Sequence, residues 1–589
     1  MNRSDSSFII SKVFKINFSA MLMGSFVAMS GILVDSVMIS RFLGERSLTS
    51  YGVVMSVFLA VSALASLLSA GGQVLAGQDL GIGNIDEANR TITLVHIWSW
   101  VLIAILIIVS LVFQEPILAG LGMTSDDGDL YLMCKEYMIG LIIGYPGIVW
   151  STVMSQFLPI DSDTKRSFLS TIIMTVVNIT GDFLNVFLFH GGMFGMALAT
   201  SVSYYVSFLV VLPHYLNPRY SLKLYVPGAD IKKLPALLKS GLPTAINRGM
   251  TAFRNIGLNR ILLLISTTSA VGALTVGRSL ANFYNPLLIA LGMVVLMMGS
   301  AFLKEKDSHT LFDLLKTMVK YCYGPIMICM VLLLVFSKPL TGMFIDRSSD
   351  IFASSHLCVI CMVIALPFNC FNLGMTNYLQ SIGKTTASLI YSIVENGAVL
   401  LIMAFILGNL IGDTGVWISF PLTEVIILIS FLIYSWIFNR HIPHSIKDLL
   451  FLDERYGVPE SDQLNTSICT MEQVTGFSEE VRQFCLKKNM DRKTSNLMAL
   501  CVEEMAGNII RWGFDDGKPH SIDLRLIYTE GKTSLRIRDD CKPFDPRKQA
   551  EIYQSQTDVQ NIGIRMISAL TKDIRYVYMM KMNVLFLEV

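Results

Sequence analysis

The sequence predicts an all-α polytopic membrane protein with twelve transmembrane helices in two six-helix bundles, followed by a C-terminal α+β domain. Three observations support this fold class. The 589 residues are 53% hydrophobic and only 15% charged, whereas a soluble protein carries about a quarter charged residues. Apolar windows of about 20 residues, the length of a bilayer-spanning helix, recur along most of the chain. After about Arg440 these windows stop and the composition becomes charged.

The net charge and the N-terminal residues exclude two other interpretations, a nucleic-acid-binding protein and a chain with a cleavable signal peptide. A net charge of +1 argues against nucleic acid as a partner, so membrane lipid is the expected surrounding. Residues Met1 to Ser7 are polar, and the first apolar run is too long for a cleavable signal peptide.

Twelve spans follow from apolar windows bounded by charges or turn residues. They cover approximately 13–42, 51–77, 91–113, 130–158, 167–190, 193–216, 235–266, 273–300, 315–336, 351–381, 385–408 and 413–439.

The two halves of this region resemble each other. The segment NFSAMLMGSFVAMSGILVDSVMISRFLG in the first half is similar to SGLPTAINRGMTAFRNIGLNRILLLIS in the second. A repeat of this size is typical of transporters whose substrate path lies between two bundles. We therefore divide the chain into 1–220 (first lobe), 221–442 (second lobe), 443–463 (linker) and 464–589 (C-terminal domain).

Lysine and arginine in the short loops predict the orientation. With the N-terminus in the cytoplasm, the cytoplasmic loops hold most of these cations, including Lys165, Arg166, Lys304, Lys306 and Lys384. An even number of spans returns the C-terminus to the cytoplasm. We expect a multi-pass protein of the bacterial cell membrane with both termini inside.

The first span carries one full charge, Asp35, between Lys15 and Arg41. A carboxylate at this depth costs a few kcal/mol to insert, so it should face the protein interior or a watery cavity. We interpret it as an ion- or proton-binding group; the alternative is a buried acid held by hydroxyls and amides for packing alone.

Three further polar residues lie at membrane depth in the first half. Asn178 and Asp182 are four residues apart and share a helix face, and Thr200 follows on the next helix after a Gly-Gly turn. With Asp35 they would form an oxygen-rich pocket suited to a proton or Na⁺.

Several segments together resemble the multidrug and toxic compound extrusion (MATE) family over residues 10–440. They are VDSVMISRFLGERSLTSYGV, VNITGDFLNVFLFHGGMFGMALATS and LKEKDSHTLFDLLK. The resemblance implies an antiporter that uses a Na⁺ or H⁺ gradient to export small amphipathic compounds. It assigns ion coupling to Asp35, Asn178, Asp182 and Thr200.

The second half departs from many relatives. Its seventh span carries Arg248, Arg254 and Arg260, and the nearest acid at depth is Glu395. We take Arg254 and Glu395 as substrate-path candidates that could pair, which makes an anionic or zwitterionic substrate plausible. For Arg248 we favour a structural role, either in a salt bridge that packs the bundle or by extension to the cytoplasmic face.

In the C-terminal domain we expect helices near 478–488, 492–512 and 561–570, and strands near 521–529, 533–538, 573–580 and 583–589. Glu504 and Asn508 share a helix face, where a carboxylate could act as a base beside a Mg²⁺ ligand. Asp539 ends a strand before Pro543 and could accept a hydrogen bond from adenine, and Gly563 opens a helix whose amides could bind phosphate.

These motifs, in the order EEMAGN, RIRDDCKPFDP and QNIGIR, resemble the histidine-kinase-like ATPase (GHKL) fold, in its anti-sigma-factor serine kinase branch. The resemblance implies a sandwich that binds Mg·ATP, with Glu504 as the catalytic base, Asn508 as the metal ligand, and Asp539, Pro543 and Gly563 around the nucleotide. Cys541 stands where the family has glycine. Weak or absent turnover, as ATPase or serine kinase, is therefore an open alternative.

The favoured function is a multidrug or metabolite efflux antiporter with a cytoplasmic ATP-binding-like regulatory domain. No G-x-x-x-x-G-K-[ST] motif is present, which argues against ATP-driven transport. One alternative is a membrane sensor whose C-terminal domain acts on a regulatory protein. The other is a lipid-precursor flippase of the wider superfamily.

Overall fold

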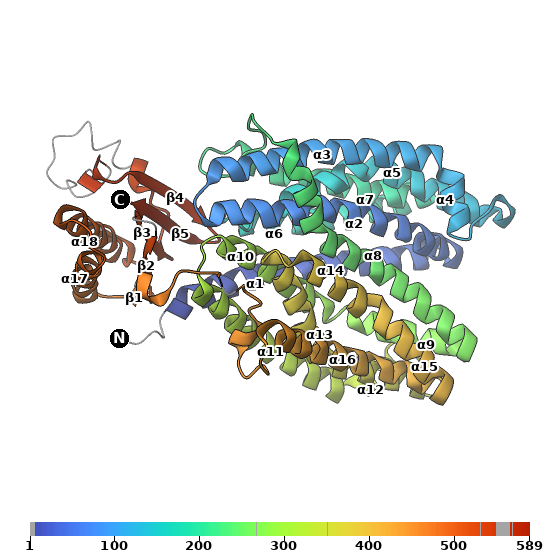
Figure 1. Ribbon diagram of the computed structural model, residues 1–589. Helices are drawn as coiled ribbons and strands as arrows, with labels where there is room; N and C mark the ends of the chain where they lie inside the picture. Colours follow the sequence, from blue (N-terminus) through green and yellow to red (C-terminus); the bar gives the residue numbers. More distant parts are fainter. Residues whose placement is uncertain are drawn as a thin grey trace.

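The computed structural model describes residues 6–266, 268–349, 351–453, 455–529, 532–548, 566, 567 and 569–589. A large helical bundle forms one part, and a small sheet with two helices forms the other (Figure 1). The sheet lies at one end of the bundle, and the first helix also begins at this end (Figure 1). We call this end of the bundle the docking end.

Long helices account for the first half of the bundle. They are α1 (Ser6–Met38), α2 (Glu45–Gly81), α3 (Ile85–Val112), α4 (Gln114–Gly120), α5 (Asp129–Ser155), α6 (Thr164–Leu184) and α7 (Gly192–Leu216).

The second half repeats this arrangement with more breaks. It consists of α8 (Leu234–Ile265), α9 (Thr268–Ala281), α10 (Asn285–Leu303), α11 (Ser308–Val335), α12 (Ser337–Gly342), α13 (Phe352–Ser381), α14 (Thr385–Ile393), α15 (Val399–Ile411) and α16 (Asp413–Asn439).

Among the described residues, eleven helices are long and apolar enough to cross a membrane. The expected span over 235–266 is present as α8, whose 32 residues would suffice in length, but its arginines lower the hydropathy. The expected span over 273–300 is divided into α9 and α10, and Pro286 stands in the first turn of α10, where its missing N–H is no loss.

Helix packing follows the repeat that the sequence predicts. Within the halves, α5 packs on α7 as α13 packs on α16, and α6 packs on α7 as α15 packs on α16. Between the halves, α2 packs on α8 and α10 packs on α1. The two bundles therefore exchange equivalent contacts across their shared boundary, as expected for two related lobes.

Glycines allow α2 and α8 to approach closely. A Cβ atom on Gly71 would lie 2.1 Å from the Leu237 carbonyl oxygen, and one on Gly241 would lie 1.9 Å from the Leu67 carbonyl oxygen. Any larger residue would meet backbone, which cannot rotate away. This glycine contact sets the distance between the lobes near the docking end.

The C-terminal domain is an antiparallel five-stranded sheet in the order β1-β2-β3-β5-β4. Its elements are β1 (Gln463–Ile468), α17 (Met471–Lys487), α18 (Arg492–Asn508), β2 (Ile522–Thr529), β3 (Lys532–Asp539), β4 (Asp573–Met579) and β5 (Met582–Glu588). Strand β1 is absent from the sequence-based expectation, and α17 begins earlier than expected because Thr470 and Gln473 form a capping box. Most of the expected helix over 561–570 lies outside the described residues.

The sheet has two differently covered faces. Leu524, Leu526, Leu535 and Ile537 join the core formed with α17 and α18. Val577, Met579, Val584 and Met582 join the core of the helical bundle instead. The sheet thus lies between α17 and α18 on one side and the docking end on the other (Figure 1).

The close approach of α2 and α8 can be tested with two alanine variants of one helix. Gly241→Ala should lower the melting temperature in detergent, because overpacking a tight contact costs about 1–3 kcal/mol. Gly249→Ala is the matched control: a Cβ there meets nothing within 4 Å, so it should be neutral or slightly stabilising. Equal melting temperatures for the two variants would contradict the packing described.

Candidate functional site

The two carboxylates predicted for ion coupling lie side by side in the first lobe. Asp35 in α1 and Asp182 in α6 are close enough to interact directly, and their exposed fractions are 8% and 0%. Asp35 Oδ1 and both carboxylate oxygens of Asp182 have no hydrogen-bond partner among the described residues. Nor does either acid form an ion pair within 4.0 Å in the described part of the chain. Both acids are therefore buried without a fixed cation.

Asn178 lies one turn before Asp182 on α6. The Asn178 side-chain amide donates to Thr200 Oγ1 at 3.5 Å, which links α6 to α7. Helices α6 and α7 approach closely because a Cβ on Gly181 would lie 2.7 Å from Ala199 Cβ. The turn between them is held by Asn185, whose side chain accepts from the Gly191 amide and donates to the Gly192 carbonyl. The predicted residues thus come together from α1, α6 and α7.

Sequence reasoning missed three tyrosines around the acids. Tyr51, Tyr137 and Tyr204 lie close enough to Asp35 to interact with it electrostatically. The rings of Tyr51 and Tyr137 pack edge to face with centroids 5.6 Å apart. Their position inside apolar spans could have identified them as part of a polar site, since a buried tyrosine hydroxyl usually needs a hydrogen-bond partner.

A second polar site lies mainly in the other lobe, and Met29 and Leu59 of the first lobe also line its cavity. A cavity of about 400 Å³ is lined by both substrate-path candidates, Arg254 and Glu395, together with Arg278 and Glu424. The expected ion pair between Arg254 and Glu395 is not formed: no such contact within 4.0 Å occurs in the described ranges. Glu395 instead accepts from Thr376 Oγ1 at 3.3 Å, so both charged groups remain available to the cavity.

Glu424 and Arg278 were not identified from the sequence. Glu424 accepts from Asn369 at 2.7 Å and from Asn372 at 2.8 Å, and Arg278 donates to Asn259 Oδ1 at 3.2 Å. Each is a charged residue inside an apolar segment, and this feature could have identified them from the sequence.

Arg248 makes a packing contact between helices. It donates to Ser62 Oγ in α2 at 2.7 Å, a hydrogen bond where a salt bridge was one of the two expected forms. The hydrogen bond crosses the boundary between the lobes, so a nearby hydroxyl satisfies the guanidinium group.

The C-terminal domain contains a cavity of about 550 Å³ between α18 and the sheet. Its lining includes Asn508, Asp539 and Pro543, as the motif comparison predicts, with Tyr576 and Asn583 from β4 and β5. Glu504 is not among the described lining residues, although it lies one turn before Asn508 on the same helix. Gly563 lies outside the described residues.

Asp539 is held rigidly in this cavity. Its Oδ1 atom accepts from the Asn583 amide at 2.7 Å and from the Cys541 backbone N–H at 2.9 Å. Burial raises the pKa of Asp539 to about 6, although these hydrogen bonds oppose the rise. At neutral pH the group is therefore mainly a carboxylate that can accept one more hydrogen bond.

The opposite face of the sheet forms a charge cluster with the second lobe. Arg525, Arg536 and Arg538 are almost fully buried. Arg536 and Arg538 both donate to the Glu305 carboxylate, and Arg536 also donates to Asp307 and Asp523 at 3.0 Å each. Three cations thus meet three acids at the turn between α10 and α11.

This cluster keeps its charges over a wide pH range. Burial alone would raise the pKa of Asp307, but Arg536, Arg525 and Arg538 lower it well below its ordinary value. A depressed carboxyl pKa stabilises the contact above the unfolded-state pKa, and the contribution is lost as pH falls through the folded-state pKa. The contact should therefore persist at neutral pH and weaken only on strong acidification.

The β4–β5 side of the same sheet contacts the first lobe. The Met580 amide donates to the Ile160 carbonyl at 2.9 Å, and the Lys581 amide donates to Ser162 Oγ at 2.8 Å. Arg575 donates to the Ile82 carbonyl at 2.8 Å. Gly83 has φ +74° and packs against the Arg575 side chain. The sheet therefore contacts turns from both lobes at the docking end.

Comparisons with known proteins agree with both parts. The MatE family matches residues 20–184, and the histidine kinase-like ATPase domain family matches residues 469–587. The uncharacterized transporter YisQ of Bacillus subtilis is 24% identical over 413 residues, which cover 66% of this chain and 86% of YisQ. The multidrug export protein MepA of Staphylococcus aureus is 22% identical over 428 residues, which cover 71% of this chain and 90% of MepA.

Solved structures show the same membrane fold. A mutant of the Vibrio cholerae MATE transporter VcmN matches with a TM-score of 0.69 and 19% identity, covering 76% of this chain and 100% of that chain. An outward-facing multidrug resistance MATE family transporter matches with a TM-score of 0.66 and 21% identity, covering 72% and 94%. The chain therefore carries a match to the MatE family over residues 20–184, the fold of MATE transporters in its helical bundle, and a match to the histidine kinase-like ATPase domain family over residues 469–587.

Proposed function

We propose that this protein is an efflux antiporter driven by a Na⁺ or H⁺ gradient, and that its C-terminal domain binds nucleotide and regulates transport. The observation that carries the transport proposal is the pair Asp35 and Asp182, buried side by side without a fixed cation. The names of relatives such as MepA support export of multiple drugs as the general activity.

The coupling step follows from the chemistry of this pair. Two carboxylates in a low-dielectric site repel each other when both are charged. A proton or a Na⁺ ion held by their oxygens removes that repulsion, and hard oxygen ligands suit a hard cation. Binding and release of the ion would thus change how tightly α1 packs on α6.

The cavity in the second lobe supports a substrate of mixed charge. Two arginines and two glutamates line it, and Arg254 is not paired within 4.0 Å with a described acid. A small amphipathic compound with both a cationic and an anionic group would find a partner for each. A purely cationic compound would pair with the glutamates but would leave the two guanidinium groups without an anionic partner, which disfavours it.

We infer that the docking end faces the cytoplasm. The turns at this end hold Lys165, Lys304, Lys306 and Lys384, and cytoplasmic loops carry an excess of lysine and arginine. The C-terminal domain and the start of α1 would then both be cytoplasmic.

Regulation follows from how the sheet is docked. Alternating access moves one lobe against the other, so opening toward the docking end must separate their turns. The sheet holds Ile82 and Ile160 of the first lobe and Glu305 of the second. While docked, it keeps this end closed.

The cavity between α18 and the sheet, which we call the nucleotide cavity, adjoins the contact between the sheet and the helical bundle. On β3, Arg538 binds the second lobe and the next residue, Asp539, lines the cavity on the opposite face. A ligand that shifts β3 or its following loop would disturb both. We therefore propose that Mg·ATP, held by Asn508, Asp539 and Pro543, changes the docking of the sheet.

Two other functions remain distinguishable by experiment. A membrane sensor would use the same interface to pass a signal from the bundle to the C-terminal domain and then to a regulatory protein, and would move no substrate. A lipid-precursor flippase would move substrate regardless of imposed Na⁺ and pH gradients.

The coupling proposal is tested in vesicles with Na⁺ and pH gradients imposed separately. Asp35→Asn and Asp182→Asn should each reduce gradient-driven efflux to the level of protein-free vesicles, because a neutral amide cannot exchange the ion. Asp126→Asn, in an exposed loop, should transport like wild type. Gradient-dependent efflux that survives in Asp35→Asn would remove the site from the mechanism.

Nucleotide binding is tested by titrating the full-length protein with Mg·ATP. Asp539→Ala removes a hydrogen bond to a charged acceptor, worth about 1.5–3 kcal/mol, and should weaken binding roughly 10- to 100-fold. Glu480→Ala on the exposed side of α17 serves as the control. Equal affinities for wild type and Asp539→Ala, or no binding by either, would contradict the assignment.

The docking contact is tested through Glu305. Glu305→Gln leaves Arg536 and Arg538 without their shared acid, and breaking a buried ion pair costs about 3–5 kcal/mol. We expect faster hydrogen exchange in β3 and higher efflux than wild type. Asp462→Asn removes a partly exposed pair with Lys488, which should matter little. Unchanged exchange and efflux in Glu305→Gln would refute the closing role of the sheet.

A further inference from the structure

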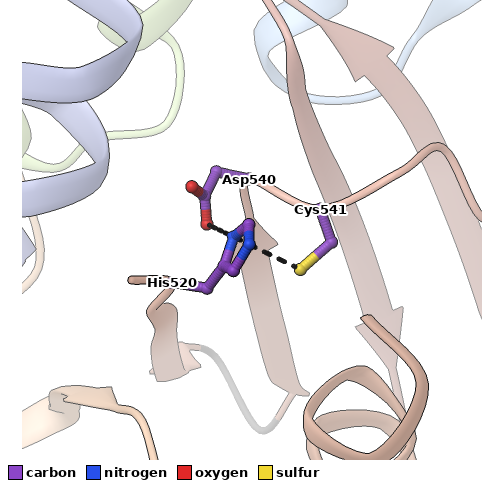
Figure 2. A group of neighbouring side chains, drawn as sticks. All are labelled: His520, Asp540 and Cys541. Atoms are coloured by element: carbon purple, nitrogen blue, oxygen red, sulfur yellow. Dashed lines mark hydrogen bonds and ion pairs between the residues drawn. The ribbon is translucent and has the colours of Figure 1, made fainter. Parts of the chain in front are cut away.

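A cluster of three different metal-binding side chains lies beside the nucleotide cavity. His520 comes from the segment before β2, and Asp540 and Cys541 follow β3 directly (Figure 2). The imidazole nitrogen, the carboxylate oxygen and the sulfur all lie within 4.8 Å of one another. The exposed fractions of His520 and Cys541 are 9% and 8%, so the cluster is shielded from solvent.

The spacing of these atoms is close to that of a tetrahedral metal site. His520 Nδ1 is 3.1 Å from Asp540 Oδ1 and 3.9 Å from Cys541 Sγ, and Figure 2 shows both contacts. With Zn–N and Zn–O near 2.1 Å and Zn–S near 2.3 Å, tetrahedral zinc separates N from O by about 3.4 Å and N from S by about 3.6 Å. The N–O and N–S separations observed here each differ from these values by a few tenths of an ångström, and the Asp540 oxygen and the Cys541 sulfur lie within 4.8 Å of each other.

Neighbouring charges orient two of the three groups, the imidazole and the carboxylate, as in known metal sites. His520 Nε2 faces Asp516 Oδ1 at 2.8 Å, and metal-binding histidines commonly share their second nitrogen with a carboxylate. Lys12 of α1 binds the other oxygen of Asp540, Oδ2, which leaves Oδ1 directed at the imidazole. The ring and the carboxylate are each held in place from outside the cluster.

We propose that His520, Asp540 and Cys541 bind a divalent transition-metal ion of borderline softness, with zinc as the best fit and water as a fourth ligand. The donor set is one nitrogen, one oxygen and one sulfur, which suits zinc better than the hard ions Mg²⁺ or Ca²⁺. The carboxylate and the cysteine thiolate together balance the +2 charge. On binding, the metal replaces the thiol proton of Cys541 and any proton on Nδ1, and these protons leave to solvent.

Such an ion would act on the regulatory part of the molecule. It would fasten the segment before β2 to the loop after β3, and this loop continues into Pro543 at the nucleotide cavity. Cys541 lines that cavity, and Asp540 contacts α1 of the transporter region through Lys12. The metal would therefore hold the loop that adjoins both the cavity and the docked membrane helix. This site does not depend on nucleotide binding, and its test does not use nucleotide.

The test is a competitive titration of metal-stripped full-length protein in detergent with Zn²⁺ and a chromophoric zinc chelator. We expect one zinc ion per chain. Cys541→Ser and His520→Ala should abolish this binding, and Asp516→Asn should weaken it about 10- to 100-fold, the usual effect of losing a supporting carboxylate. Cys469→Ser, at an exposed cysteine before α17, should bind zinc like wild type.

Two measurements keep the result independent of folding defects. Co²⁺ bound to the wild-type protein should show the absorption of a cobalt–thiolate bond, and Zn²⁺ should slow alkylation of Cys541 but not of Cys469 in the same sample. Absence of stoichiometric zinc, or zinc retained equally by Cys541→Ser and His520→Ala, would overturn the proposal. So would an alkylation rate at Cys541 that zinc does not change.

Discussion

A charge removed from water must be paired, hydrogen-bonded or shared with a mobile ion, and this constraint governs every functional part of this protein. In the second lobe, hydrogen bonds from asparagine and threonine stabilise the buried glutamates. At the interface with the sheet, three arginines and three acids are in contact. In the first lobe, Asp35 Oδ1 and both carboxylate oxygens of Asp182 have no hydrogen-bond partner among the described residues, so this pair is the part of the protein where fixed side chains satisfy the constraint least.

The sheet of the C-terminal domain connects these parts because its two faces are used differently. In β3, Leu535 and Ile537 pack under the helices, whereas Arg536 and Arg538 reach the turn between α10 and α11. Successive side chains of a strand point to opposite faces. Along β3, residues that face the cavity, such as Asp539, therefore alternate with residues that contact the helical bundle, such as Arg538.

Much of this architecture could be predicted from the chain. The hydrophobic windows predicted the spans, the internal repeat predicted the paired lobes, and the alternation in residues 521–529 and 533–538 predicted β2 and β3. Asn178, Asp182 and Thr200 could be grouped because the first two share a helix face and a glycine turn brings the third close, whereas Asp35 was added for its membrane depth and by the family resemblance. Glu424 and Arg278 could not be placed in the same way, since nothing local shows which distant helix they face.

The sequence by itself determined what is apolar, what repeats and which charges lie at membrane depth, because these properties depend on residue type and spacing alone. Only the tertiary structure decided that Arg525, Arg536 and Arg538 are buried against Glu305 and Asp307. In the sequence these arginines occupy the polar positions of an alternating strand, which usually face water. Their burial depends on a surface more than two hundred residues away, and no local pattern carries that information.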